Sequence, residues 1–333
     1  MTASGLIQRL APGMRWARRL GQLAFIVVGI AIVNFFLLRL APGDAAEVLA
    51  GEAGAATPEF MAALRQQFGF DQPLHVQFGK YLGNVLTLNL GYSFRQSMPV
   101  SQLIGDRLPA TAILMGASIT FALVAGTALG FLAARRAGRP TDTIISVIAL
   151  LFYATPVFWI GVVLIVVFSV WLDWLPVGGM TTIEAGYHGT AYALDVARHL
   201  VLPAVTLGLF NLAIYARLTR ASMLQIYGQD FIRTAVAKGV APGRIAIRHV
   251  LRNALLPIVT MLGMQAGSIL GGAILVETVF SWPGLGRLAF EALFQRDLNL
   301  LLGILLASSI SVVVVNIAVD LAYGLLDPRV EIG

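Results

Sequence analysis

The sequence of 333 residues contains no cysteine, only two lysines (Lys80 and Lys238) and few charged side chains of any kind. The missing cysteines exclude a disulfide scaffold, a thiolate metal site and a cysteine nucleophile. Charged residues make up 12% of the chain and hydrophobic residues 58%, whereas soluble domains carry about 25% charged residues. Too few charges remain to cover a soluble surface, so lipid must be the solvent for much of this chain.

Motifs for nucleotide binding and catalysis are also missing. Neither lysine stands in a G-x-x-x-x-G-K-[ST] phosphate loop, because Tyr81 follows Lys80 and Gly239 follows Lys238. The four histidines lack H-E-x-x-H spacing, and G-x-S-x-G is absent. We therefore predict that the chain is not an enzyme and has no catalytic residue, metal site or cofactor of its own.

Six stretches are long and apolar enough to cross a membrane, since a spanning helix needs about 20 mostly apolar residues. The stretches are residues 20–40, 110–134, 143–171, 200–218, 254–279 and 298–326. Pro109 suits the first turn of the second stretch, and Pro156 predicts a kink or tilt in the long third stretch. The sequence therefore predicts an all-α integral membrane protein with six transmembrane helices.

The basic residues indicate the orientation of these helices. Of the 23 Lys and Arg residues, 15 fall on the side that holds residues 1–19, the loop after residue 134, the segment from Arg217 to Arg252 and residues 327–333. Because basic loops stay in the cytoplasm, both termini are predicted to be cytoplasmic. This placement explains the net charge of +6 without a nucleic-acid partner. No convincing cleavage site follows the basic arm 1–19, so we expect residues 20–40 to be retained rather than removed as a signal peptide.

The segment 41–108, on the opposite side, has helical punctuation of its own. Thr57 can cap a helix and Pro58 suits its first turn, and a second amphipathic stretch covers about residues 75–88. We predict a small helical external subdomain. Two roles stay open: a structural cap over the bundle, or contact with a ligand or an external partner protein.

The loop 219–253 contains a short predicted helix over residues 229–238. Asp230 favours the positive end of the helix dipole and Lys238 the negative end. Gly239 can form the C-terminal cap, and Pro242 prevents continuation. Ten residues give about 15 Å of helix, half a bilayer, so this helix should lie along the membrane surface.

The predicted surface helix has two faces. Phe231, Ile232 and Ala235 share one face, whereas Asp230, Arg233 and Thr234 share another. Further along the loop, arginines recur at every fourth residue and form a predicted basic stripe: Arg244, Arg248 and Arg252. This stripe suits a lipid headgroup anchor or contact with an acidic groove on a partner.

Small and polar residues within the apolar stretches complete the set of candidates. Gly126 and Gly130 form one small-xxx-small pair, and Gly263, Gly267 and Gly271 form a longer ridge. Such ridges permit close helix packing, within the chain or with a homologous subunit. Candidates for a transport pathway or gate are Gln265, Glu277, Trp282, Pro283 and Asn316. An ion-coupled secondary transporter is the alternative function, followed by a membrane enzyme, although more ionisable residues at mid-membrane are typical of such carriers.

Several blocks of the sequence resemble the permeases of bacterial dipeptide/oligopeptide ABC importers. They are QDFIRTAVAKG (229–239), RHVLRNALLP (248–257), VETVFSWPGLG (276–286), LDPR (326–329), RLAPGD (39–44), FDQPL (70–74), LGYS (90–93) and DRLPAT (106–111). The resemblance covers nearly the whole chain and points to the first permease of the pair. Of the general Glu-Ala-Ala…Gly signature of importer permeases, the chain keeps Ala235 and Gly239.

The resemblance implies a type I ABC importer permease fold in the bacterial inner membrane, with a permease core over 109–326 and a periplasmic insertion over 41–108. It implies that the loop 219–253 carries a coupling helix that contacts the ATPase. The residues implied in this coupling are Asp230, Phe231, Arg233, Thr234, Ala235, Lys238 and Gly239.

The resemblance also implies four kinds of partner. They are a homologous second permease, two ATP-binding subunits or domains that hold ATP and Mg²⁺, an external solute-binding protein and the lipid bilayer. The substrate cannot be read from the residues: relatives carry dipeptides, oligopeptides, glutathione, nickel chelates, opines or small glycans, and peptide import is the default expectation.

Overall fold

The computed structural model describes residues 21, 25, 27–37, 72–87, 89–93, 95–183, 185–265 and 269–326. The chain divides into two compact units. Unit 1 comprises residues 1–106 and 291–313, and unit 2 comprises residues 107–290 and 314–333. The predicted helix near Thr57 lies outside the described residues, as do the predicted tail 327–333 and the whole of the arm 1–19.

Unit 1 contains short elements that hydrogen bonds tie together. They are the apolar helix Val27–Leu37, helix α5 (Leu74–Leu86), the hairpin of β1 (Tyr92–Ser93) and β2 (Met98–Pro99), and parts of α6, α14 and α15. Ser93 Oγ donates a hydrogen bond to the carboxylate of Asp297, which in turn accepts 3.1 Å from the backbone nitrogen of Leu300 at the start of α15. Asn34, 2% exposed, donates to the carbonyl of Leu302 at 3.2 Å.

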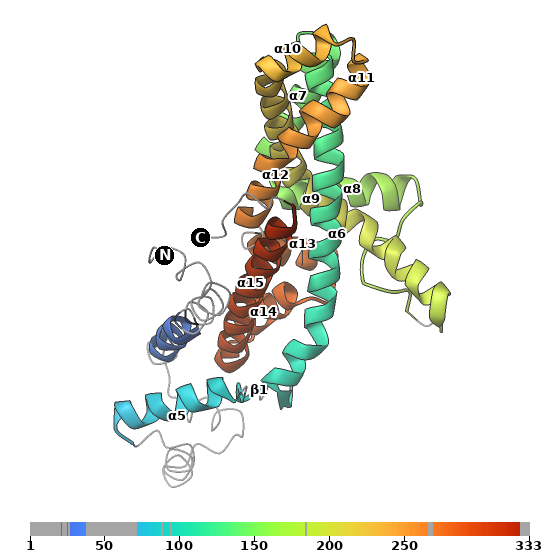
Figure 1. Cartoon of the computed structure of the whole chain (residues 1–333). Coiled ribbons are helices and arrows are strands. Elements are labelled where there is room, and N and C mark those ends of the chain that lie inside the picture. The colour runs from blue at the N-terminus through green and yellow to red at the C-terminus, as the bar shows by residue number, and fades with distance from the viewer. Residues whose placement is uncertain are drawn as a thin grey trace, which may run out of the picture. The chain divides into compact units, whose positions relative to one another are not determined.

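Unit 2 holds most of the long helices (Figure 1), and its described residues form no sheet. The elements from α6 onward are α6 (Val100–Arg135), α7 (Pro140–Ala154), α8 (Val157–Leu164), the π-helix η1 (Ile165–Trp171), α9 (Gly189–Tyr227), α10 (Asp230–Ala237), α11 (Pro242–Arg244), the π-helix η2 (Ile245–Leu251), α12 (Arg252–Gln265), α13 (Ile269–Val279), α14 (Leu285–Phe294) and α15 (Leu298–Leu326). Helices α6, α14 and α15 continue from one unit into the other.

Four helices of the described residues are long and apolar enough to cross a membrane, and the bent pair α7–α8 makes a fifth candidate. These helices contain the predicted stretches 110–134, 200–218 and 298–326, the start of 254–279 and, as the bent pair, 143–171. Within the predicted stretch 20–40, the described helix Val27–Leu37 is shorter than a span. The chain is therefore a mostly helical, multi-pass membrane protein.

The second predicted stretch begins too late. Helix α6 starts at Val100, and Pro109 lies inside it rather than in its first turn. Proline removes one backbone donor but is tolerated within membrane helices when neighbouring groups satisfy the freed carbonyl. The apolar pattern could not show these first turns, because residues 100–108 include the polar side chains of Gln102, Asp106 and Arg107.

The third predicted stretch is broken where Pro156 predicted a kink. Helices α7 and α8 meet at an angle of 107° across residues 155–156. Thr155 and Pro156 both have extended backbone, with ψ values of 135° and 132°. The Thr155 hydroxyl donates to the carbonyl of Leu151 at 2.7 Å. The break results from Pro156, because proline disfavours helical backbone at the preceding residue.

The predicted pair Gly126 and Gly130 forms a close seam between α6 and α9 within unit 2. A Cβ atom on Gly126 would lie 2.8 Å from the carbonyl oxygen of Leu212, and one on Gly130 would lie 2.4 Å from that of Ala216. This seam confirms intramolecular packing for the first ridge. The packing around the glycines of the second ridge (263, 267 and 271) falls outside the described part of the chain.

Candidate functional site

The surface helix predicted in the loop 219–253 is present as α10, Asp230–Ala237, with Gln229 and Lys238 at its two ends. Gly239 has a φ of +72°, a left-handed conformation that glycine adopts without steric cost. The backbone nitrogen of Gly239 donates to the carbonyl of Val236 at 2.9 Å, and that of Val240 donates to Ala235 at 3.2 Å. These two bonds are those of a Schellman cap, so the predicted role of Gly239 in ending the helix is confirmed.

The inner face of α10 rests on an apolar cluster. Ile232 and Ala235 are 4% and 9% exposed, and they pack with Met223 of α9, Val250 of η2 and neighbouring apolar residues. Only two residues separate the end of α9 from the start of α10, and this cluster packs α10 against the end of that 39-residue helix. Through Ala254 the same cluster also includes the start of α12.

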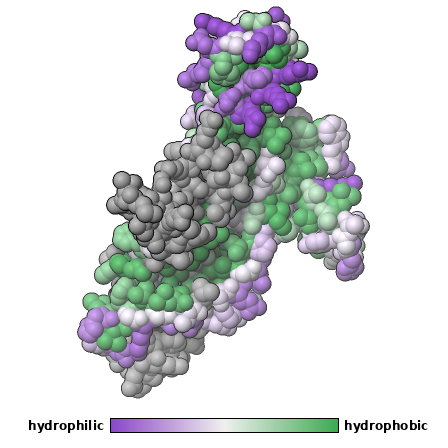
Figure 2. Space-filling view, in the orientation of Figure 1, coloured by the Kyte–Doolittle hydropathy of each residue, from purple (hydrophilic) through white to green (hydrophobic). Residues whose placement is uncertain are grey.

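The outer face of α10 is exposed and carries both polar and apolar side chains. Phe231 is 43% exposed and Val236 is 60% exposed, beside the exposed residues Asp230, Arg233 and Thr234. Phe231 stands at the edge of the face that it shares with Ile232 and Ala235, where the apolar cluster no longer covers it. Figure 2 shows hydrophilic residues gathered at the end of unit 2 that carries α10 and α11.

The predicted basic stripe lies on exposed residues, but on a different kind of helix. Residues Ile245–Leu251 form the π-helix η2, so Arg248 stands on a wider turn than an α-helix provides. Arg244, Arg248 and Arg252 are all exposed. Ile245, Ala246 and Val250 face inward in the same segment. The cations are therefore presented on the surface next to α10.

An ion pair between a buried carboxylate and a half-buried guanidinium lies at the same end of unit 2. Arg220 donates from Nε and Nη2 to the Asp142 carboxylate at 2.6 and 2.8 Å. The backbone nitrogen of Gly138 donates to the same carboxylate at 3.0 Å. One carboxylate thus joins the turn after α6, the start of α7 and the end of α9. We call these three residues the Asp142 clamp.

The Asp142 clamp has a clear electrostatic consequence. Asp142 precedes the apolar run that begins at Thr143, and Arg220 follows the run that ends at Leu218. The hydrogen bond from Arg220, with that from Gly138, lowers the pKa of the Asp142 carboxyl to about 2. The same pairing raises the pKa of Arg220. Asp142 is therefore ionised throughout the physiological pH range, and its ion pair with Arg220 is retained over that range.

A second polar centre surrounds Glu277, near the end of α13. This carboxylate is fully buried; it accepts from Thr111 Oγ1 at 2.7 Å and from the backbone nitrogen of Arg287 at 2.9 Å. Thr111 Oγ1 also accepts from the backbone nitrogen of Leu285 at 2.7 Å. Glu277 and Thr111 thereby satisfy two of the free N–H groups at the start of α14.

Glycine makes this arrangement possible. A Cβ atom on Gly284 would lie 2.2 Å from Glu277 Oε1, too close for any other residue at this position without displacement of the carboxylate. Trp282 is also fully buried and donates from Nε1 to the carbonyl of Ala110 at 2.9 Å. We refer to residues 277–287 as the Glu277 turn.

The predicted pathway and gate candidates therefore fall in different places. Glu277 and Trp282 are buried within the Glu277 turn, and Pro283 is partly buried beside them. Asn316 is exposed on α15, and Gln265 ends α12 with its side chain outside the described part of the chain. The structure does not gather these five residues into one site, and their roles in transport stay predictions.

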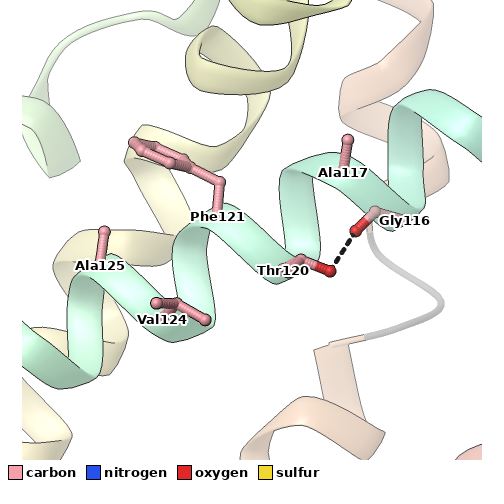
Figure 3. A pocket seen from close by; sticks show the side chains of 6 residues that line it. All are labelled: Gly116, Ala117, Thr120, Phe121, Val124 and Ala125. Atoms are coloured by element: carbon pink, nitrogen blue, oxygen red, sulfur yellow. Dashed lines mark hydrogen bonds between the residues drawn. The ribbon is translucent and has the colours of Figure 1, made fainter. Parts of the chain in front are cut away.

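An open apolar groove runs along one face of α6. It has a volume of about 490 Å³ and is lined by Gly116, Ala117, Thr120, Phe121, Val124 and Ala125 (Figure 3). The Thr120 hydroxyl donates to the carbonyl of Gly116 at 2.7 Å, so it is already satisfied within the helix. This groove offers shape and apolar surface but no free side-chain donor for a polar solute.

Sequence reasoning missed the Asp142 clamp and the part that Thr111 takes in the Glu277 turn. The clamp joins residues 78 positions apart, and no local pattern shows such a pairing. A weak signal was available for Asp142, because an acidic residue just after Pro140 is typical of a helix start. Thr111 gave no comparable signal.

Comparisons with known proteins agree with this architecture. The model of the family described as "Binding-protein-dependent transport system inner membrane component" matches residues 126–332. The N-terminal family model of such membrane components matches residues 14–115.

Curated relatives match along nearly the full chain. The "Di/tripeptide transport system permease protein DppB" of Pseudomonas aeruginosa is 40% identical, over 95% of this chain and 98% of the relative. The "Dipeptide transport system permease protein DppB" of Escherichia coli K12 is 38% identical, over 94% and 97%. The "Oligopeptide transport system permease protein AppB" of Bacillus subtilis is 39% identical, over 92% and 95%.

A solved structure shows the same fold. A chain of the MetNI methionine ABC transporter, in an inward-facing conformation, aligns with a TM-score of 0.54 and 19% sequence identity. The alignment covers 68% of this chain and 97% of that chain. At this identity the likeness concerns the fold alone. With the family matches, it leads to one conclusion: the chain belongs to the inner-membrane components of binding-protein-dependent transport systems, as a permease of the dipeptide/oligopeptide ABC importer type.

Proposed function

We propose that this chain forms, together with a homologous second permease, the path by which an ATP-driven importer carries peptides or similar small solutes across the bacterial inner membrane. The exposed outer face of α10 is the observation that carries this proposal. Phe231 and Val236 leave apolar surface uncovered between polar groups, which is the composition of a protein interface with a polar rim. The relatives named as peptide permeases support the class of solute.

In this proposal α10 is the coupling helix. A groove of an ATP-binding subunit would contact the exposed residues Asp230, Phe231, Arg233, Thr234 and Lys238. Ala235 would anchor the helix in the apolar cluster beneath it, and Gly239 would end the helix. Closure of two such subunits on ATP would push α10, and the apolar cluster would pass the movement to α9 and α12. The chain itself then needs no nucleotide or metal, because ATP and Mg²⁺ are held by the partner subunits.

The arginines give the proposed orientation. Arg244, Arg248 and Arg252 lie exposed beside α10, and basic segments stay on the cytoplasmic side. Both termini and α10 would then be cytoplasmic, with six spans in total. The segment 41–108, which includes α5, would be periplasmic and lie where an external solute-binding protein delivers its solute.

Reconstitution of the complex with and without its ATP-binding subunits tests this function. The proposal expects peptide uptake into proteoliposomes that needs ATP, the binding protein and both ATP-binding subunits. Uptake that survives without the ATP-binding subunits but collapses with the proton gradient would contradict it and favour an ion-coupled carrier. Turnover of a solute by the isolated chain would favour a membrane enzyme.

A further inference from the structure

Arg217 is a cation inside an apolar helix stretch, and its side chain is held in an unusual direction. It lies one residue before the end of the predicted span 200–218 on α9 and is exposed. Its guanidinium carbon lies 4.6 Å from the centre of the Tyr153 ring. No carboxylate of the described residues forms an ion pair with it, in contrast to Arg220 three residues later.

The packing of α7 against α9 shows in which direction this guanidinium points. The two helices run antiparallel, because Asp142 at the start of α7 pairs with Arg220, while Tyr153 near its end stacks on Phe210 with ring centres 5.0 Å apart. Tyr153 is ten residues beyond Thr143, where the apolar run begins. Ten residues correspond to about 15 Å of helix, or half of a hydrocarbon core of about 30 Å.

Arg217 starts one residue inside the predicted span, and its side chain therefore points inward along α9 rather than toward the nearer surface. Side chains of a helix lean toward its N-terminus, which for α9 is the end away from Arg220. Arginines near a helix end normally extend outward to the headgroups. Contact with Tyr153 holds Arg217 in the opposite direction, and charged groups at this depth face water-filled cavities or polar partners rather than lipid.

The backbone next to Tyr153 leads to the same conclusion independently. Helix α7 ends at Ala154, and residues 155–156 are extended. Within the described chain, no hydrogen bond reaches the carbonyls of Phe152, Tyr153 or Ala154. Tyr153 and Ala154 are exposed. Unpaired peptide groups at membrane depth are tolerated only inside protein or along a water-filled cavity, so this face of α7 does not meet lipid.

We propose that Arg217, held over Tyr153, lines the water-filled pathway and binds the carboxylate of the transported solute. A guanidinium presents two parallel N–H donors that match a carboxylate, and every unmodified peptide carries one at its C-terminus. The free carbonyls at the end of α7 are acceptors of the kind that an ammonium group needs. This inference rests on the proposed function, because it assigns a contact within the same pathway.

A comparison of matched peptides tests the proposal. Uptake of trialanine and of trialanine amide is measured in proteoliposomes that contain the full complex, for wild type and for Arg217→Gln. The ratio of the two uptake rates is compared between the proteins, because any preference of the binding protein is the same in both and cancels. We expect Arg217→Gln to lower the acid-to-amide ratio about tenfold, with Arg217→Lys intermediate because its ammonium lacks the planar pair of donors.

Two controls keep the result specific. N-acetyl trialanine keeps its carboxylate but loses the ammonium, so Arg217→Gln should lower its uptake about as much as that of trialanine. Arg139→Gln removes an equally exposed arginine from the loop between α6 and α7 and should leave the ratio unchanged. Gel filtration of each complex confirms that the variants assemble.

Three outcomes separate the explanations. An unchanged acid-to-amide ratio in an assembled, active Arg217→Gln complex would overturn the proposal. Equal loss for acid and amide that depends on the content of phosphatidylglycerol in the vesicles would also overturn it, since the guanidinium would then bind a lipid phosphate. If the wild-type complex takes up neither peptide, the proposed function itself fails, and that result differs from both others.

Discussion

Helix α10 and the Glu277 turn are both short connections between long helices of unit 2, yet they treat their polar and apolar groups differently. In the Glu277 turn, the carboxylate, the Thr111 hydroxyl and the Trp282 nitrogen all have hydrogen-bond partners in a buried setting. Helix α10 buries only Ile232 and Ala235 and leaves a mixed outer face uncovered. A fully satisfied buried network makes a rigid joint, whereas an uncovered mixed face is suited to a partner.

The largest effect is expected from Glu277→Ala. This change removes the carboxylate that accepts from the Thr111 hydroxyl and from the Arg287 backbone nitrogen in a buried site, and it leaves a cavity. We expect the free energy of unfolding to fall by about 3 kcal/mol or more, measured as thermal unfolding of the purified complex. Glu277→Gln keeps the volume and one acceptor, so it should lose less. Equal stability of Glu277→Ala and wild type would contradict the rigid-joint interpretation.

The seam between α6 and α9 provides the next test, because two glycines of one helix differ in their surroundings. Gly130→Ala places a methyl group 2.4 Å from the carbonyl oxygen of Ala216 and should destabilise the chain by about 1–3 kcal/mol. A Cβ atom on Gly116 meets nothing within 4 Å. Gly116→Ala should therefore be neutral or stabilising by up to about 1 kcal/mol. The same thermal measurement compares them, and similar losses in both would contradict the seam.

Gly239→Val, at the C-terminal cap of α10, should uncouple ATP hydrolysis from transport. A left-handed φ costs a non-glycine residue about 1–2 kcal/mol, and the strain breaks the cap that ends α10. We expect more ATP hydrolysed per peptide carried, with membrane insertion unchanged. Gly243 has no left-handed φ and open space around it, so Gly243→Ala is the matched control. An unchanged ratio in Gly239→Val would argue against the coupling role.

The Asp142 clamp should respond to substitution and pH in a defined direction. Asp142→Asn removes the charge but keeps the shape, and we expect about 1–2 kcal/mol of lost stability, because Arg220 remains partly screened by solvent. The folded pKa of about 2 lies below the ordinary value of 3.8. The clamp therefore contributes its full stability above about pH 5 and loses it progressively as the pH falls through 3.8 and then through 2.

Thermal unfolding of wild type and Asp142→Asn across this pH range checks the prediction. The difference between the two proteins should be constant from pH 8 to about pH 5 and shrink at lower pH. A difference that grows on acidification would have the wrong sign. Arg136→Gln, in the neighbouring exposed loop, is the control for a loss of charge alone.

The smallest effect on stability is expected from Val236→Ser on the outer face of α10. Because Val236 is 60% exposed, the free energy of unfolding should change by less than about 0.5 kcal/mol. Transport should nevertheless fall if an ATP-binding subunit covers this face. Ile232→Ala, on the buried face of the same helix, should instead lower stability by about 2 kcal/mol or more.

The sequence predicted those parts of the fold that depend on local patterns. Apolar runs located the spans, Pro156 located the break, and Gly239 located the end of α10, since each of these depends on the residues at that place. The exposure of Phe231 could not be predicted, because burial on that face depends on η2 and α9, which the periodicity of α10 does not contain. The start of α6 was also missed, because the polar residues before Pro109 hide its first turns.

Contacts between distant residues could not be predicted from one sequence. Asp142 pairs with Arg220, Glu277 with Thr111, and Tyr153 with Arg217 only after α6, α7, α9 and α13 pack together. The charge count placed Arg217 with the surface cations, because sequence shows where a side chain starts and not where its charged end lies. The local spacing of 229–239 therefore located helix α10 and its cap, while the packed structure was needed for the polar contacts behind it.

The central claim is that α10 is the surface on which an ATP-binding subunit acts. The chain has no cysteine, so Val236→Cys introduces a unique thiol that can carry a photo-activated cross-linker in the assembled complex. The account predicts a cross-link to the ATP-binding subunit whose yield changes when ATP is added. A cross-link to lipid or water alone, in a complex that hydrolyses ATP and transports peptide, would contradict it.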